Sequence, residues 1–345
     1  MERNIFTLKT LTKIYEQIKP MHSSIWDKLV GEEIAEKTQK FEVHTKNAGR
    51  LKAPLVGRRE KGVFIAKGAF ETTVYEPPML KLYTVNEAEK MFEQKFGHTE
   101  WDSPEATAKE ELAKELVDLR KIAMRTKIWM LLVLATTGVC PVGESAEIGI
   151  KYDADFTQEV LSKGEDFKNP EFDIIGYFEK KQTDRYKETG KVIDTIIMAP
   201  DIVPYFTQNK YVIEDQKTIN SNLIQLSQKV ENLSEGMKLV AFLPKLNITI
   251  YSYIDWAKNP DDEQEEQLLP AGTLIGLKSK SFIVRYGALA LREKAGEKAK
   301  LFVRKEVVRT WYPDGSEDDE LQLHSSPLIM PEDAKGYFCA KVIAE

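Results

Sequence analysis

The sequence contains few of the residues on which disulfide scaffolds and metal-dependent enzymes rely. Its 345 residues include four histidines and two cysteines. Cys140 and Cys339 are too few for the disulfide framework of a small secreted protein, and we expect both to be reduced and buried. None of the histidines is at metal-ligand spacing, and there is no H-E-x-x-H motif. We therefore predict no metal site.

Motifs of nucleotide-binding and hydrolytic enzymes are also missing. There is no G-x-x-x-x-G-K-[ST] loop and no G-x-G-x-x-G loop. Residues 143–147 lack the closing glycine of a nucleophile elbow. His324 is followed by Ser325 and Ser326, but adjacency in sequence is not triad geometry, and a junction between a strand and a turn explains it more simply. We predict no catalytic residue and no cofactor.

The chain is not basic and has no long apolar run. Its formal net charge is −6, whereas proteins that coat nucleic acid are usually basic, so any contact with DNA should be local and weak. The longest apolar run, residues 128–135, is far shorter than the roughly 20 residues that span a bilayer. The first 20 residues lack the apolar core of a signal peptide. We expect no membrane association, and a protein that stays in a cytoplasm or enters a particle built there.

Residues 104–137 are predicted to form one long helix. Ser103 suits the N-cap, Pro104 suits the first helical position, and Gly138 is well placed to end the helix. One face carries the apolar positions Leu112, Leu116, Leu119 and Ala123. The last turns, residues 128–135, are apolar on every face, so we expect that end to be buried. A helix of this length measures about 50 Å, which is typical of a structural strut.

The chain before this helix lacks an apolar pattern that could form its own core. Residues 1–48 are weakly patterned, and we interpret them as an arm that needs another surface. We expect residues 1–20 to contribute little to the fold of one subunit. Residues 49–83 contain spaced glycines and alternating apolar residues and end at Pro77 and Pro78, a pattern typical of a long β-hairpin or extended loop.

Charge is segregated along the sequence. Residues 46–67 hold seven basic residues and one acidic residue, a net +6, whereas residues 255–266 and 314–320 each carry a net −5. These segments are complementary, and between identical copies their pairing would be an assembly device. A solvated surface hairpin with exposed acidic loops is the simpler alternative. The candidate contact residues between subunits are Arg58, Arg59, Lys61, Lys67, Asp261, Asp262, Glu263, Asp318 and Asp319.

The rest of the chain predicts an α+β fold with much antiparallel sheet. Short apolar runs separated by turn residues predict strands at 147–152, 173–177, 192–198, 238–242, 247–253, 273–277, 282–286, 302–308, 321–324 and 337–343. Residues 218–233 have the pattern of a helix. The length and the 42% hydrophobic content are sufficient for two domains.

Taken in order, these parts resemble the Hong Kong 97-type capsid fold, and short motifs resemble the lambda-type bacteriophage major capsid protein family. The motifs cover nearly the whole chain. They are Pro54-Leu55-Val56 with Gly57, Phe70, Tyr75-Glu76-Pro77-Pro78, Leu134 to Gly138, Ile193 to Asp201, Leu269-Pro270 with Thr273, Arg285-Tyr286-Gly287, Ser326-Pro327-Leu328 with Pro331, and Phe338 to Ile343.

Two segments depart from the family pattern. The strand after the long helix often ends in Gly-Arg in the family, but here Ile148 to Asp153 lacks that pair. The charged residues 292–300 resemble an insertion.

The resemblance implies an α+β capsid fold built from five parts. These are an N-terminal arm at 1–48, an extended loop (β-hairpin) at 49–98, a peripheral domain at 99–190 and 311–345 with the spine helix 104–137, and an axial domain at 191–310. In such a shell, the extended loop would lie over a neighbouring subunit and the arm would tuck under one.

The function implied is that of a major capsid protein of a tailed bacteriophage or prophage. It would assemble as pentamers and hexamers into an icosahedral head shell, without catalysis. Its partners would be copies of itself, a scaffolding protein, a portal, a maturation protease and a decoration protein, and packaged DNA would be near it without specific contact. It would be made in the host bacterial cytoplasm and end in the virion.

Two other functions stay open from the sequence. An encapsulin-like nanocompartment shell shares the fold class and would enclose cargo proteins instead of DNA. An unrelated soluble enzyme is disfavoured by the missing catalytic constellation.

Overall fold

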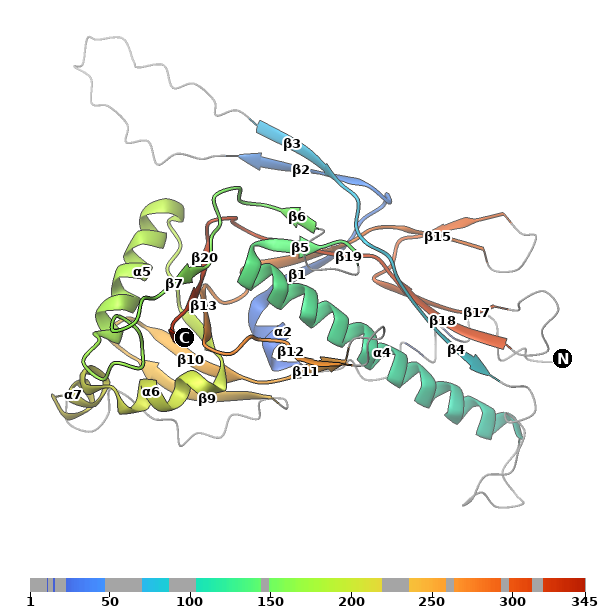
Figure 1. Ribbon diagram of the computed structural model, residues 1–345. Coiled ribbons are helices and arrows are strands. Elements are labelled where there is room, and N and C mark those ends of the chain that lie inside the picture. Colours follow the sequence, from blue (N-terminus) through green and yellow to red (C-terminus); the bar gives the residue numbers. More distant parts are fainter. Residues whose placement is uncertain are drawn as a thin grey trace, which may run out of the picture.

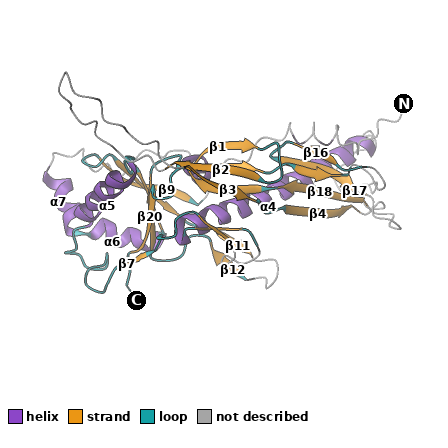
Figure 2. Cartoon of the chain, turned by 90° about the horizontal axis from the view of Figure 1, so that it is seen from above, coloured by secondary structure: helices purple, strands orange, loops and turns teal. Residues whose placement is uncertain are grey.

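A computed structural model describes residues 11, 15, 23–46, 70–86, 104–143, 149–218, 236–258, 264–292, 298–311 and 319–344. The molecule is elongated (Figures 1 and 2). The helices α5 (Ile174–Thr189), α6 (Val203–Gln208) and α7 (Lys210–Thr218) and a large sheet lie at one end, a smaller sheet lies at the other, and one long helix connects them.

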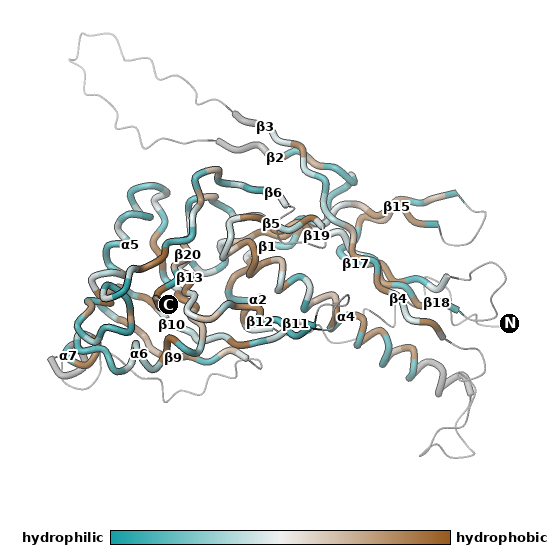
Figure 3. Tube along the Cα trace, in the orientation of Figure 1, coloured by the Kyte–Doolittle hydropathy of each residue, from teal (hydrophilic) through white to brown (hydrophobic). Residues whose placement is uncertain are grey.

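The long helix is α4, Pro104–Thr137, with the bounds that the sequence predicts. Figure 3 shows polar and apolar residues alternating along its N-terminal part. The predicted face, from Leu112 to Ala123, is buried against the smaller sheet. The last turns enter the main core, as expected for residues that are apolar on all sides. Gly138 follows with φ +76°, and a Cβ there would lie 2.4 Å from the Phe156 ring, so glycine is required to end the helix.

The large sheet has six strands in the order β7-β20-β13-β8-β10-β9. Its strands are β7 (Glu159–Val160), β8 (Thr195–Met198), β9 (Met237–Leu243), β10 (Ile248–Tyr253), β13 (Thr273–Leu277) and β20 (Tyr337–Lys341). The helices α5, α6 and α7 lie around it, with a 3-10 turn at Pro200–Ile202. The central strands β8 and β13 are buried at every position, so their apolar runs do not alternate.

The smaller sheet packs on α4 and has three antiparallel strands in the order β17-β18-β4. They are β17 (Glu306–Trp311), β18 (Asp319–Ser325) and β4 (Leu80–Asn86). Leu321 and Leu323 of β18 and Val308 of β17 meet the apolar face of α4. Because side chains alternate along a strand, the neighbouring positions face away from the helix.

Another three-stranded sheet connects the two ends, in the order β1-β14-β19. It consists of β1 (Val30–Ala35), β14 (Phe282–Tyr286) and β19 (Pro327–Pro331), and the short helix α2 (Ser24–Leu29) precedes β1. Four two-stranded sheets complete the fold. They pair β2 (Phe41–Lys46) with β3 (Phe70–Tyr75), β5 (Val139–Pro141) with β6 (Gly149–Lys151), β11 (Trp256–Lys258) with β12 (Glu265–Gln267), and β15 (Leu289–Leu291) with β16 (Lys300–Phe302).

The hairpin formed by β2 and β3 projects from the body of the molecule (Figure 1). Its first strand begins at Phe41, inside the segment that the sequence assigned to the arm, because residues 41–46 pair with 70–75. The strand pairing therefore joins residues 41–46 of that segment to residues 70–75 of the segment assigned to the extended loop. The basic residues between these strands lie outside the described residues.

The structure differs from further sequence-based expectations, among them the single strand at 302–308, which is divided between β16 and β17. Residues 173–177 are not a strand but the start of α5, because the Asp173 side chain accepts a hydrogen bond from the Gly176 amide and caps the helix. The arm contributes to the core of its own subunit, since Leu11 is fully buried in the cluster on α4. Of the helix expected at 218–233, only Thr218 lies within the described residues, at the end of α7.

The domain boundaries stay a prediction. The large sheet takes β7 and β20 from the segments assigned to the peripheral domain and its four other strands from the segment assigned to the axial domain.

Candidate functional site

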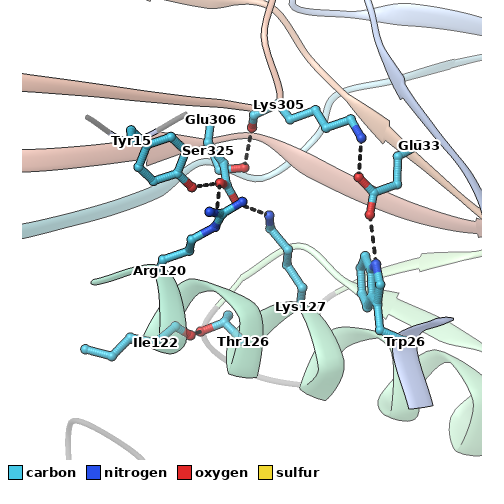
Figure 4. Close-up of polar contacts among 10 residues, drawn as sticks. All are labelled: Tyr15, Trp26, Glu33, Arg120, Ile122, Thr126, Lys127, Lys305, Glu306 and Ser325. Carbon is cyan, nitrogen blue, oxygen red and sulfur yellow. Dashed lines mark hydrogen bonds and ion pairs between the residues drawn. The ribbon is translucent and has the colours of Figure 1, made fainter. Parts of the chain in front are cut away.

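A cluster of charged side chains lies where β17 meets α4, β1 and the N-terminal segment (Figure 4). Its centre is the dipeptide Lys305–Glu306 at the start of β17. The Ser325 hydroxyl in β18 donates a hydrogen bond of 2.8 Å to the carbonyl oxygen of Lys305, which fixes the dipeptide to the neighbouring strand. We call these contacts the polar junction.

Glu306 binds two different elements with its two oxygens. The Lys127 ammonium group of α4 contacts Oε1, and the Tyr15 hydroxyl group donates a hydrogen bond to Oε2. The Arg120 Nε atom, also on α4, lies 4.0 Å from Oε2. Lys127 is only 3% exposed, so this ion pair is inside the protein. One carboxylate therefore joins the long helix and the arm to the smaller sheet.

The helix presents both cations to the sheet because they are seven residues apart, about two turns of an α-helix. The Arg120 guanidinium group lies over the Tyr15 ring, 4.7 Å from its centroid. The Lys127 ammonium group lies 5.0 Å from the centroid of the Tyr286 ring in β14. Both contacts have cation–π geometry, so each cation contacts an aromatic ring as well as Glu306.

Burial disfavours the charged forms of both Lys127 and Glu306, which form the central ion pair. It lowers the pKa of Lys127 to about 8, although the nearby Glu33 carboxylate acts in the opposite direction. It raises the pKa of Glu306 to about 7. The direct contact between the two groups compensates for part of the water that each has lost, and Tyr15 and Arg120 add to it at Glu306. Removing one partner would leave the other charge buried without its direct ion pair.

Glu33 of β1 extends the polar junction towards α2. It accepts a hydrogen bond of 2.8 Å from the Trp26 indole and one of 2.6 Å from the Lys305 ammonium group. Burial alone would raise the pKa of Glu33, but the hydrogen bonds from Lys305 and Trp26 outweigh it, and the pKa is lowered. Lys305 and Glu306 thus connect the smaller sheet directly to α4, to the N-terminal segment and to β1, and through Glu33 to α2.

The polar junction consists of ion pairs and hydrogen bonds and has no arrangement of nucleophile and base. Within the described ranges, no group of three His, Cys, Asp or Glu side chains lies together as metal ligands would. No helix in that part of the chain is both long and apolar enough to cross a membrane. These contacts can hold α4, β1 and the N-terminal segment in fixed positions against β17, and the loss of one charge would weaken them.

Of the nine candidate contact residues, the described part of the chain contains one. Asp319 begins β18 and lies opposite Asn86 of β4. The basic candidates at 58–67 and the acidic ones at 261–263 and 318 lie outside the described residues. Their role as contacts between subunits stays a prediction.

Sequence reasoning missed the polar junction. Its one local signal is Lys127, a cation directly before the all-apolar residues 128–135. Its partner Glu306 is 179 residues away. No spacing rule connects two residues so far apart in the sequence.

The architecture of the chain is similar to that of known protein structures. A prophage protein of Escherichia coli CFT073, assigned as its capsid protein, superposes with a TM-score of 0.66 at 16% identity, over 98% of this chain and 99% of that one. A phage-related protein from Bordetella bronchiseptica RB50 superposes with a TM-score of 0.52 at 8% identity, over 97% of both chains. No curated protein sequence matches the chain.

The fold is therefore that of the Hong Kong 97-type phage capsid proteins, as the sequence resemblance implied. Residues 7–342 match the family described as phage major capsid protein E. The chain belongs to this family, and the identification as a phage major capsid protein is confirmed.

Proposed function

We propose that the chain assembles as pentamers and hexamers into the icosahedral head shell of a tailed bacteriophage or prophage, which encloses packaged DNA. The match of the phage major capsid protein E family to residues 7–342 carries this proposal. The protein is a structural component of the virion, made in the cytoplasm of the host bacterium, and it catalyses no reaction. Its further partners are a scaffolding protein, a portal, a maturation protease and a decoration protein.

The projecting β2–β3 hairpin supports contacts between copies. Its two described strands, β2 and β3, extend away from the body of the molecule (Figure 1). The basic segment 46–67, net +6, begins at the last residue of β2 and continues into the sequence between the two strands, whereas residues 255–266 and 314–320 each carry −5. In the proposed shell, Arg58, Arg59, Lys61 and Lys67 of one copy face Asp261, Asp262, Glu263, Asp318 and Asp319 of neighbouring copies.

Electron microscopy and sedimentation of the expressed chain test the shell. Closed particles of uniform size support it, and a chain that stays monomeric at all concentrations contradicts it. Nucleic acid inside particles recovered from infected or induced cells separates a phage head from a protein-filled compartment.

Charge reversal tests the contact. Arg58→Glu with Arg59→Glu should leave the circular dichroism of the subunit unchanged and reduce particle yield at least tenfold. High salt should weaken wild-type assembly in part, because exposed charges are screened within about 8–10 Å. The matched control is Lys180→Glu with Lys187→Glu, since both lysines are exposed on α5. Normal particles from the first variant would remove the electrostatic contact but not the shell.

A further inference from the structure

Among the described residues, the smaller sheet ends in a strand, β4, with one unpaired edge. β4 pairs along its whole length with β18, from Asn86 opposite Asp319 to Leu80 opposite Ser325. In the described part of the chain, no strand pairs with its other edge. β4 contains no proline, and its register with β18 has no bulge. A long and regular open edge of this kind accepts an additional strand through backbone hydrogen bonds.

Large apolar side chains of β4 are exposed beside this edge. Tyr83 is 62% exposed and Val85 is 54% exposed, whereas Leu82, on the opposite face of the strand, packs on α4. The preceding Met79 is 41% exposed. These residues belong to one outer face of the sheet, because β-strand side chains alternate. Exposed apolar residues gathered on one face indicate a binding surface more often than isolated ones do.

A shallow, open groove of about 640 Å³ lies over this outer face. Tyr83, Gln322 and Arg309 make one row across its three strands, and Val85, Glu320 and Trp311 make the next row. Leu291 and Arg292 of the neighbouring β15 segment also line it.

The groove is basic although the chain as a whole is acidic. Its charged lining consists of Lys81, Arg292 and Arg309 against Glu320. His324 adds no charge at neutral pH, because burial lowers its pKa to about 4. Arg309 is held by Gln322 and by the carbonyl oxygen of Arg292, but Lys81 and Arg292 form no ion pair within the described part of the chain. Two cations are therefore available to a ligand.

We propose that the open edge of β4 and its basic groove bind an extended acidic segment of a different protein by strand addition. The added strand pairs its backbone with β4. On the side facing the groove it places a carboxylate near Lys81 and apolar or aromatic side chains beside Tyr83 and Val85, since directly opposed residues of paired strands interact. Backbone pairing supplies affinity, and the alternating side chains supply specificity.

The chain's own charged segments are poor occupants. The basic segment 46–67 would be repelled by the basic groove. The acidic segment 255–266 has its two described ends paired with each other in β11 and β12. The acidic residues 314–318 belong to the short connection between β17 and β18 and are tied at both ends. A segment of another protein is free of these constraints.

A designed peptide tests the proposal on the full-length chain. The probe is a fluorescent eight-residue peptide with the sequence Thr-Glu-Thr-Tyr-Thr-Glu-Thr-Val. In the control peptide, lysine replaces both glutamates. Fluorescence anisotropy should show that the chain binds the acidic peptide and does not bind the lysine control peptide. Lys81→Glu with Arg292→Glu should weaken it at least tenfold, because both side chains are exposed and their reversal leaves the fold intact. The surface control Lys180→Glu with Lys187→Glu should not change it.

Backbone methylation separates strand addition from simple charge attraction. In a paired strand, the N–H groups of alternate residues point to the same edge. Two versions of the acidic peptide, N-methylated on odd or on even residues, should therefore differ, and only one should lose binding. Equal loss, equal retention, or binding that survives the Lys81 and Arg292 reversal would overturn the proposal.

Self-association is the competing outcome. If the wild-type chain dimerises in sedimentation, Val85→Lys abolishes the dimer, and the acidic peptide does not compete, the occupant is a second copy and the proposal is wrong. Particle formation by the same proteins, observed by electron microscopy, is measured separately. Particles without peptide binding contradict this inference alone, and peptide binding without particles contradicts the proposed shell alone.

Discussion

The two halves of α4 lie in opposite kinds of surroundings. Beyond Lys127, the helix enters a core in which Leu131, Leu132, Leu134 and Ala135 are all fully buried. Before it, the helix has one apolar face on the smaller sheet and carries Arg120 and Lys127 to Glu306. Apolar packing is non-directional and tolerates small shifts, whereas a buried ion pair is satisfied in one geometry only. We infer that the core gives this subunit its stability and the polar junction fixes the position of the smaller sheet and the arm.

The largest expected effect comes from breaking the helix that both halves share. Leu116→Pro removes a backbone hydrogen bond and a fully buried side chain, at a cost of about 3 kcal/mol or more for the proline alone. We expect no folded protein. Circular dichroism and urea unfolding measure this, with Ile122→Ala at a half-exposed position of the same helix as the control. A cooperative transition at the wild-type midpoint would show that 104–137 does not act as one rod.

The next largest effect is expected from variants of the ion pair in the polar junction, whose free energies of unfolding should be coupled. Lys127→Met and Glu306→Leu should each destabilise the subunit by about 3 kcal/mol, because each leaves one buried group without its partner. The double variant should be less destabilised than the sum of the two by about 1 kcal/mol or more. Urea unfolding of all four proteins at pH 7 gives this coupling energy. Additive effects would mean that the ion pair does not hold the sheet.

Acid should affect the smaller sheet before the main core. Burial, with Arg309 and Lys81 nearby, lowers the pKa of His324 from 6.5 to about 4. Between these values the unfolded chain binds more protons than the folded one. The stabilisation is therefore complete above pH 6.5 and is lost as the pH falls through 4, by about 2–3 kcal/mol. Stability measured between pH 7 and pH 4 should fall less steeply in His324→Gln, and identical slopes would contradict this assignment.

The smallest effect concerns the arm. Tyr15→Phe removes the hydroxyl group that donates to Glu306 and keeps the ring over Arg120, so we expect a loss of about 1 kcal/mol. Tyr211→Phe, at an exposed position of α7, should change nothing. Urea unfolding measures both. If the two variants are equal, the contact with Glu306 does not stabilise the arm.

Periodic apolar patterns predicted the regular elements well. The bounds of α4, β13 and β14 are those of the apolar runs. Residues 173–177 were wrongly predicted to form a strand because Ile174 and Ile175 are β-branched. They form the start of a helix instead, because the Asp173 side chain caps its N-terminus. Residues 302–308 form two strands instead of one, because the chain turns between Phe302 and Glu306.

The sequence by itself determined the fold class, the long helix and the family, because each depends on residues close together in the chain or on the order of short motifs. Tertiary structure alone decided that Glu306 meets Lys127 and Tyr15, and that β4 becomes an edge strand with Tyr83 and Val85 exposed. Local propensity carries no information on which distant strand pairs with which helix. That choice is made by burying the apolar face of α4, and the charges that enter with it have to find partners in the same space.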